Sequence, residues 1–115
     1  MASTALLPSD RAGVCPLLAA PQSVSHGIVS QALLTAPGLR VTLFRFTAGQ
    51  EMSEHTSSAR ALVQILAGSG DFDFHGQTHQ LKQGDLLHLP PKLPHAVRAV
   101  EDMTMLLTQC DTPQA

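Results

Sequence analysis

The chain has 115 residues, of which 43% are apolar, which is enough for one hydrophobic core but short for two domains. Its net charge of -2 and the absence of Trp and Tyr argue against nucleic acid as a partner, because both the positive field and the stacking platforms are missing. No signal peptide is visible, and no stretch approaches the roughly 18 apolar residues of a membrane-spanning helix. We therefore expect a cytoplasmic protein that binds neither nucleic acid nor a membrane.

The N-terminal part of the chain differs in character from the rest. Residues 1–26 are rich in Ala, Ser and Pro and show no sustained hydrophobic period. We predict an irregular arm over this range, followed by one β domain over residues 27–112. Leu17 and Leu18 are the arm residues expected to pack on the domain, and His26 has no assignable role.

Short apolar segments follow the arm, separated by turn signals about every 8 to 12 residues, a spacing typical of a β-sandwich or barrel. We predict strands over residues 28–34, 39–47, 61–67, 71–74, 77–81, 86–89, 95–100 and 103–108. The segment before residue 60 that contains His55 is polar and is predicted as a loop. The nearly continuous apolar run 61–67 predicts a strand that is buried on both faces.

One strand and the turn that follows it carry sharper predictions. Asp71 to Phe74 alternates strictly, which places both Phe side chains on one face and both Asp side chains on the other. Gly76 then supplies the positive φ of a tight hairpin, either together with His75 or together with Gln77.

Two glycine-bounded motifs carry a family resemblance. Gly49 is followed after five residues by His55, and Gly84 is followed after five residues by Pro90, with His95 five positions further on. The stretch LVQILAGSG contains a buried strand bounded by glycines. The stretch QGDLLHLPPKLPH contains a Gly-Asp turn and a strand that ends at a proline. The pattern resembles the two motifs of the cupin superfamily, G-x5-H-x-H-x3-4-E-x6-G and G-x5-P-x-G-x2-H-x3-N, over about half of the chain.

The resemblance implies an all-β fold: an antiparallel jelly-roll barrel, or double-stranded β-helix, of the small single-domain RmlC-like type. Proteins of this kind are usually dimeric and hold any ligand in the open interior of the barrel. The strand segments 28–34 and 39–46 offer apolar surface that a second copy could cover, so we expect a homodimer.

The resemblance also implies a metal site, but half of its ligands are missing. The chain departs from the family motifs at Ser57 in place of the second histidine, Ala61 in place of the glutamate, Lys92 in place of the glycine and Ala99 in place of the asparagine. Of four expected metal ligands only His55 and His95 remain. A hydroxyl and a methyl group replace neither the nitrogen nor the charged oxygen, so we expect weak rather than tight metal binding.

Other polar side chains near the motifs leave alternatives open. Glu51 and Glu54 flank His55 and could add an oxygen ligand. His88 lies two residues before the proline that stops its strand, and its side chain points either into the barrel or away from it. If it is not a metal ligand, we expect a half-buried histidine with a backbone partner. Gln64 faces outward, toward an interface, if Ala61 faces the cavity.

The remaining candidate groups are expected to be inactive. His75 and His79 straddle the predicted hairpin, where polar side chains are usually solvated. Cys15 and Cys110 stand far apart without the Cys or His neighbours of a zinc motif, so we expect idle or buried thiols.

We therefore expect a cupin that binds a small molecule of unknown identity, with a divalent metal such as Ni, Mn, Fe or Zn held weakly between His55 and His95. Two alternatives stay open. One is a metal-dependent enzyme of the dioxygenase or isomerase type that acts on a small organic acid or sugar derivative. The other is a sensory or scaffolding module. The sequence leaves open whether the protein is an enzyme and which catalytic residues it would use.

Overall fold

The computed structural model describes residues 5–18 and 27–111, and no helix occurs in these two ranges. Nothing in them could therefore cross a membrane as a helix. The described residues form nine strands: β1 (Ile28–Ala36), β2 (Leu39–Phe46), β3 (Glu51–His55), β4 (Arg60–Ala67), β5 (Ser69–Phe74), β6 (Gln77–Lys82), β7 (Leu86–Leu89), β8 (His95–Ala99) and β9 (Met103–Cys110).

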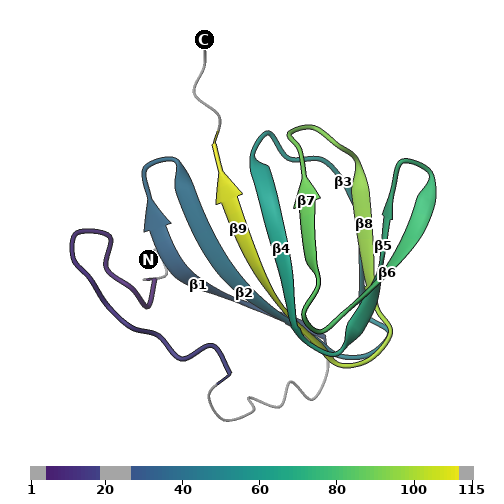
Figure 1. The fold of residues 1–115 in the computed structure, drawn as a ribbon, viewed down its shortest axis with the longest axis horizontal. Coiled ribbons are helices and arrows are strands. Elements are labelled where there is room, and N and C mark those ends of the chain that lie inside the picture. Colours follow the sequence, from purple (N-terminus) through teal and green to yellow (C-terminus); the bar gives the residue numbers. More distant parts are fainter. Residues whose placement is uncertain (1–4, 19–26, 112–115) are drawn as a thin grey trace.

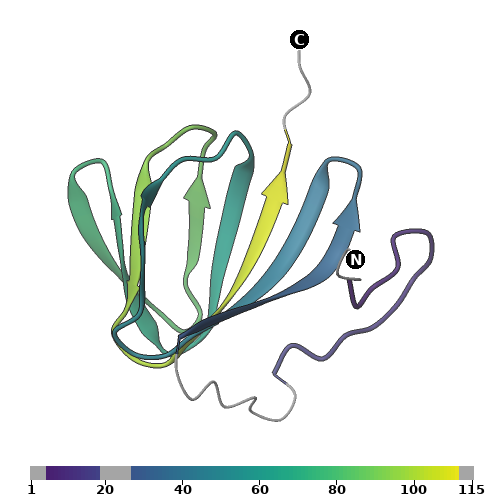
Figure 2. The same ribbon diagram turned by 180° about the vertical axis from the view of Figure 1, so that it is seen from behind.

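The strands form two sheets that face each other (Figure 1). The five-stranded sheet has the order β1-β2-β9-β4-β7, and the four-stranded sheet has the order β3-β8-β5-β6. All pairings between these strands are antiparallel. The reverse view shows the two sheets joined at one end and spread apart at the other (Figure 2). This is the all-β jelly-roll arrangement that the turn spacing and the motifs predicted.

The hydrophobic core lies between the two sheets and is built by strict alternation. In β4 the side chains of Ala61, Val63 and Ile65 are buried, whereas the positions between them are exposed. Phe72 and Val97 close the core from the four-stranded sheet. The prediction that residues 61–67 are buried on both faces is therefore wrong for the single chain. An antiparallel sheet needs cover on one face only, and Leu62 on the outer face is 40% exposed.

The segment that contains His55 is a strand and not the predicted loop. β3 pairs with β8, with Met52 opposite Val97 and His55 opposite His95, and an irregularity in the register lies between the two pairs. β3 is an edge strand in which Met52 is the only apolar residue. A strand of this kind has no hydrophobic alternation, so its pairing is visible only in the tertiary structure.

Within residues 5–18 and 27–111, two non-glycine residues adopt left-handed backbone conformations. His75 has a φ of 55° and Gly76 a φ of 72°, so the first of the two hairpin alternatives is the correct one. Lys92 has a φ of 69°, at the motif position where the family has glycine. The backbone thus keeps the conformation that glycine favours, although the side chain is that of a lysine.

Gly68 is required for a different reason. It has a φ of 77°, and a Cβ atom at this position would collide with the backbone carbonyl group of Asp102. Gly76 has a similar φ but open space around it. The turn between β4 and β5 therefore needs glycine both for its conformation and for the close approach of the chain before β9.

The N-terminal arm touches the domain at a different point from the one expected. The backbone amide of Leu7 donates a hydrogen bond to the carbonyl of Leu33 at 2.7 Å, so the arm meets the edge of β1 at this point and then turns away from it (Figure 1). Leu17 is half-buried, and Leu18 is 64% exposed. His26 lies outside the described residues.

Candidate functional site

The two histidines that the motifs single out lie side by side. His55 ends β3 and His95 begins β8, and the two are cross-strand partners. Their ring centroids are 4.3 Å apart, with an edge-to-face angle of 62°. His95 is half-buried and His55 is exposed. The pair therefore lies at the rim of the four-stranded sheet.

Backbone carbonyl groups fix the tautomer of both rings. His55 Nδ1 lies 2.8 Å from the carbonyl oxygen of Ser53, and His95 Nδ1 lies 2.9 Å from that of Leu93. A carbonyl oxygen can only accept, so each Nδ1 must carry the hydrogen and donate it. In the neutral rings each Nε2 then has a free lone pair. This is the arrangement in which imidazole binds a metal ion or accepts a hydrogen bond from a ligand.

The pair faces the space between the sheets. Along β8 the side chains of His95, Val97 and Ala99 share one face, and the latter two are in the core. His55 contacts His95 from the neighbouring strand and so lies on the same side. The structure thus brings together the two residues that the sequence selected and orients them toward the interior.

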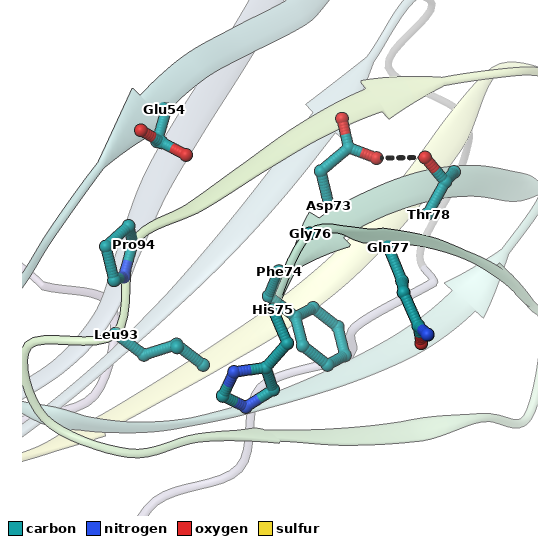
Figure 3. Close-up of a pocket in the computed structure, with 9 residues that line it drawn as sticks. All are labelled: Glu54, Asp73, Phe74, His75, Gly76, Gln77, Thr78, Leu93 and Pro94. Carbon is teal, nitrogen blue, oxygen red and sulfur yellow. Dashed lines mark hydrogen bonds between the residues drawn. The ribbon is translucent and has the colours of Figure 1, made fainter.

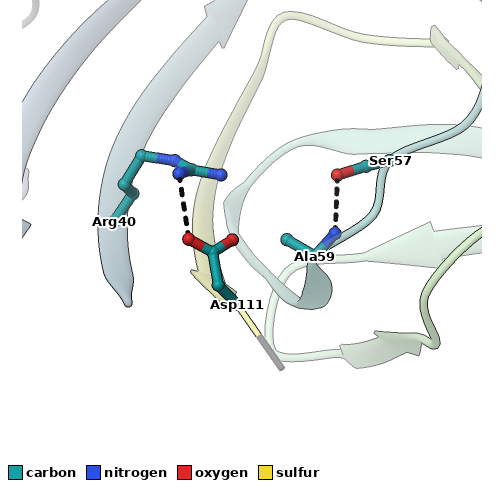
Figure 4. A network of polar contacts seen from close by, with 4 residues as sticks. All are labelled: Arg40, Ser57, Ala59 and Asp111. Atoms are coloured by element: carbon teal, nitrogen blue, oxygen red, sulfur yellow. Dashed lines mark hydrogen bonds and ion pairs between the residues drawn. The ribbon is translucent and has the colours of Figure 1, made fainter. Parts of the chain in front are cut away.

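The two vacated ligand positions are occupied by groups that do not replace the lost ligands. Ala61 faces the interior and is 6% exposed, and its methyl group cannot coordinate an ion. The hydroxyl oxygen of Ser57 accepts a hydrogen bond of 3.1 Å from the backbone amide of Ala59 (Figure 4). Figure 4 also shows the exposed ion pair between Arg40 and Asp111, at 3.6 Å.

The described residues hold no cluster of three or more His, Cys, Asp or Glu side chains that could bind a metal ion. Cys15 and Cys110 are free thiols, and Cys110 is exposed. The donor set at the His55–His95 pair therefore consists of two imidazole nitrogens. This set does not fit a tightly held resident metal, which needs more protein ligands, and it fits an ion completed by water or by a bound molecule.

The glutamates near His55 do not restore the missing carboxylate. A cavity of about 500 Å³ opens at the rim, lined by Glu54, Asp73, Phe74, His75, Gly76, Gln77, Thr78, Leu93 and Pro94. Figure 3 shows Glu54 and Asp73 on one side of this cavity and the rings of Phe74 and His75 on the other. Asp73 accepts a hydrogen bond of 2.6 Å from the hydroxyl of Thr78. Glu51 borders a second hollow of about 410 Å³ that also contains Asp73 and Arg98.

His88 points away from the interior. In β7 the side chains of Leu87 and Leu89 are buried, whereas His88 is exposed. Its Nε2 lies 2.7 Å from a guanidinium nitrogen of Arg60 and accepts a hydrogen bond from it. Of the two orientations that the sequence left open, the outward one is therefore correct, and the partner of the ring is the Arg60 side chain rather than a backbone group. Gln64 is exposed on the same outer face, as expected once Ala61 faces the cavity.

His79 is the interior residue that sequence reasoning missed. It was expected to be solvated beside a hairpin, but it is half-buried and stacks on Phe74, with ring centroids 4.0 Å apart and planes 9° apart. Its Nε2 is buried and has no hydrogen-bond partner among the residues that the structure describes. The available signal was alternation, because His79 shares a face with Leu81, which packs against the core. His75 is exposed, as expected.

Comparison with known proteins agrees with this geometry. The chain matches the cupin domain family over residues 42–108, more than half of its length. This chain belongs to the cupin family. No curated protein matched its sequence at a significant level.

Solved structures of similar proteins cover most or all of the chain. A cupin superfamily protein from Desulfitobacterium hafniense is 26% identical, with a TM-score of 0.81 over 96% of this chain and 100% of its own. A conserved Streptococcus pyogenes protein of unknown function is 29% identical, with a TM-score of 0.77 over 100% of both chains. A conserved cupin 2 barrel domain protein from Leptotrichia buccalis is 32% identical, with a TM-score of 0.72 over 82% of this chain and 45% of its own.

Proposed function

We propose that this cupin binds a small molecule at the open end of its two sheets, with His55 and His95 as contact residues. The observation that carries the proposal is the pair of Nδ1–H hydrogen bonds to backbone carbonyl groups, at 2.8 and 2.9 Å. These bonds hold two adjacent rings in one tautomer, so that both Nε2 lone pairs are available for a ligand. Such preorganisation lowers the entropy cost of binding.

We propose that a divalent metal ion, one of Ni, Mn, Fe or Zn, binds weakly between these two nitrogens. Water or the small molecule supplies its remaining ligands. The metal would attract an oxygen or nitrogen atom of the small molecule to the same place. His55 and His95 would hold the ion, and Ser57 and Ala61 would stay outside its coordination shell.

The two alternatives make different demands on the same site. A dioxygenase or isomerase acting on an organic acid or sugar derivative requires a working metal or a paired acid and base. The rim offers His55 and His95 for such proton transfer. A sensory or scaffolding role requires a partner that reads the ligand state. The binding proposal requires neither a turnover step nor a second protein.

Metal titration of wild-type protein and of two matched variants tests the site. Replacing His95 with Asn removes one of the two nitrogens, so we expect nickel affinity, measured by calorimetry, to fall at least tenfold. Replacing the exposed His88 with Asn is the control and should leave the affinity unchanged. Equal affinities for the His95→Asn and His88→Asn variants would contradict the metal proposal.

A crystal structure of untreated protein tests the small-molecule proposal itself. We expect electron density within hydrogen-bonding distance of Nε2 of His55 and His95. If density for a bound molecule occurs elsewhere and none lies beside these atoms, the rim is not the binding site.

We propose that the protein is a homodimer and that the outer face of the five-stranded sheet is covered in it. Leu62 is 40% exposed and Leu86 is 63% exposed on this face. Gln64 lies opposite both Leu86 and Leu106 in the register, so these side chains are neighbours. The apolar run of β4 has apolar side chains on both faces, and a second copy would bury the outer ones.

The expected cytoplasmic location stays a prediction.

A further inference from the structure

We propose that the cavity of about 500 Å³ at the rim binds an organic ammonium ion, that is, a protonated primary amine with a hydrocarbon part. We call this cavity the rim cavity. Neither His55 nor His95 lines it, so the proposal does not depend on a metal or a ligand at these two histidines. It adds a second binding site, with its own chemical preference, to the same end of the protein.

An uneven end of the four-stranded sheet creates the rim cavity. The pairing of β5 with β8 ends where Asp73 lies opposite Ala96. Pro94, which precedes β8, has no N–H group with which to extend the ladder. The hairpin between β5 and β6, whose turn contains His75, therefore projects past the start of β8. Side chains from this hairpin, from the end of β3 and from the loop before β8 line the hollow between them (Figure 3).

The net charge of the rim cavity is negative. Glu54 and Asp73 both line it, and Figure 3 shows them on the same side. In the described part of the chain no Lys or Arg lines it, and neither carboxylate forms an ion pair. Arg98 belongs to the neighbouring hollow, where it is paired with Asp71 at 3.7 Å. Even a protonated His75 would leave an excess of negative charge, which favours a positive ligand over an anion.

The carboxylate of Asp73 is held in place for such a contact. Its Oδ1 accepts a hydrogen bond of 2.6 Å from the hydroxyl of Thr78, which also lines the rim cavity. Its Oδ2 has no hydrogen-bond partner among the described residues. A hydrogen bond from an ammonium group to a carboxylate is charge-assisted and stronger than a neutral one. Asp73 can therefore accept such a bond without giving up another partner.

The rest of the wall favours an organic cation over a metal ion. Phe74, Leu93 and Pro94 give the rim cavity apolar surface, and the first two also pack against the core. The described residues hold no group of three or more His, Cys, Asp or Glu side chains that could bind a metal ion. The volume of about 500 Å³ is that of a small-molecule pocket and far exceeds a single ion. A hydrocarbon chain can cover the apolar wall while its ammonium group meets the carboxylates.

Three probes of equal chain length test the preference for positive charge: hexylammonium, hexanol and hexanoate. Each is titrated into the wild-type protein at neutral pH and low salt, and nuclear magnetic resonance of the backbone amides measures both affinity and place. We expect hexylammonium to bind about tenfold more tightly than hexanol and to shift the signals of Gly76, Thr78 and Leu93, because charge-assisted contacts replace neutral ones. Hexanoate should bind most weakly. Added salt should weaken the binding of hexylammonium but not that of hexanol.

A fourth probe, methylammonium, tests the apolar wall. It keeps the charge but lacks the chain, so it should bind at least about fivefold more weakly than hexylammonium. Equal affinities would show that the apolar side chains do not contact the ligand.

Matched variants test the two carboxylates. Glu54→Gln and Asp73→Asn keep the shape of each side chain but remove its charge. Each should lower the affinity for hexylammonium at least threefold and leave the affinity for hexanol unchanged. Glu51→Gln is the control, because it is the same substitution in the same strand but Glu51 borders the second hollow and not the rim cavity. All three side chains are exposed, so the variants should fold like the wild type.

Three results would overturn the proposal. Hexanol or hexanoate could bind as tightly as hexylammonium, which would contradict the charge preference. Glu54→Gln and Asp73→Asn could bind hexylammonium as tightly as Glu51→Gln does, which would show that the carboxylates are not contacts. Hexylammonium could shift signals elsewhere and not those of Gly76, Thr78 and Leu93, which would place its site outside the rim cavity. The metal titration of the His95→Asn variant tests the proposed function separately.

Discussion

Rebuilding the lost metal ligands is the most direct test of how the cupin scaffold positions its site. The double change Ser57→His and Ala61→Glu adds one nitrogen and one carboxylate to the two imidazoles of His55 and His95. If the four positions converge as they do in the family motifs, divalent metal affinity should rise at least tenfold, or about 1.4 kcal/mol. The assay is thermal unfolding of parent and variant, first with chelator and then with excess nickel, manganese or zinc.

The structure allows an estimate of how much stability the double variant loses when no metal is bound. Ala61 is 6% exposed, so a glutamate there has little access to water. An unpaired buried charge costs about 3 to 5 kcal/mol, and the loss of the Ser57 hydrogen bond to Ala59 adds about 1 kcal/mol. Small domains are stable by about 5 to 15 kcal/mol, so the variant should fold but unfold at a clearly lower temperature than the parent.

Added metal should reverse about half of this loss. At a concentration of one hundred times Kd, a ligand that binds only the folded state stabilises it by about 2.7 kcal/mol. For a domain of this size, that free energy raises the unfolding temperature by roughly 10 to 20 °C. Adding His95→Asn to the double variant is the control, and it should remove the gain. If metal stabilises the double variant no more than the parent, these positions do not converge with His55 and His95, and the metal-site interpretation must be withdrawn.

Three further expectations concern the backbone and the outer surface. Lys92→Gly should raise the free energy of unfolding, measured by urea denaturation, by about 0.5 to 1 kcal/mol, because glycine adopts a φ of 69° without the steric strain of a side chain. Lys92→Ala is the control and should give no gain. An unchanged urea midpoint for the glycine variant would contradict the expectation. Gly68→Ala should destabilise by at least about 3 kcal/mol, whereas Gly76→Ala, with a similar φ but open space, should cost only about 1 kcal/mol. Light scattering should find a dimer at micromolar concentration and a monomer after Leu62→Glu and Leu86→Glu together, and a monomeric wild type would remove the dimer proposal.

The sequence determined the positions of most strands along the chain and the identity of the histidine pair. Alternation of apolar and polar residues marks strands such as β5, in which Phe72 and Phe74 share one face. Glycine marks turns because few other residues readily adopt a positive φ. Proline marks strand ends because it has no N–H group to donate to a neighbouring strand. The spacing of the two motifs selected His55 and His95, and the structure places their rings 4.3 Å apart.

The tertiary structure alone decided which face of each strand is covered. Alternation divides a strand into two faces but does not say which of them meets the other sheet. His88 therefore could not be placed from sequence, and it lies on the outer face beside Arg60. For His79 the only signal was the face that it shares with Leu81, and the structure places its ring inside, on Phe74. β3 could not be recognised because its strand conformation depends on pairing with β8, about forty residues away in the chain. Local sequence records propensity and periodicity, whereas strand pairing and burial depend on contacts between distant segments, and those contacts exist only once the two sheets have assembled.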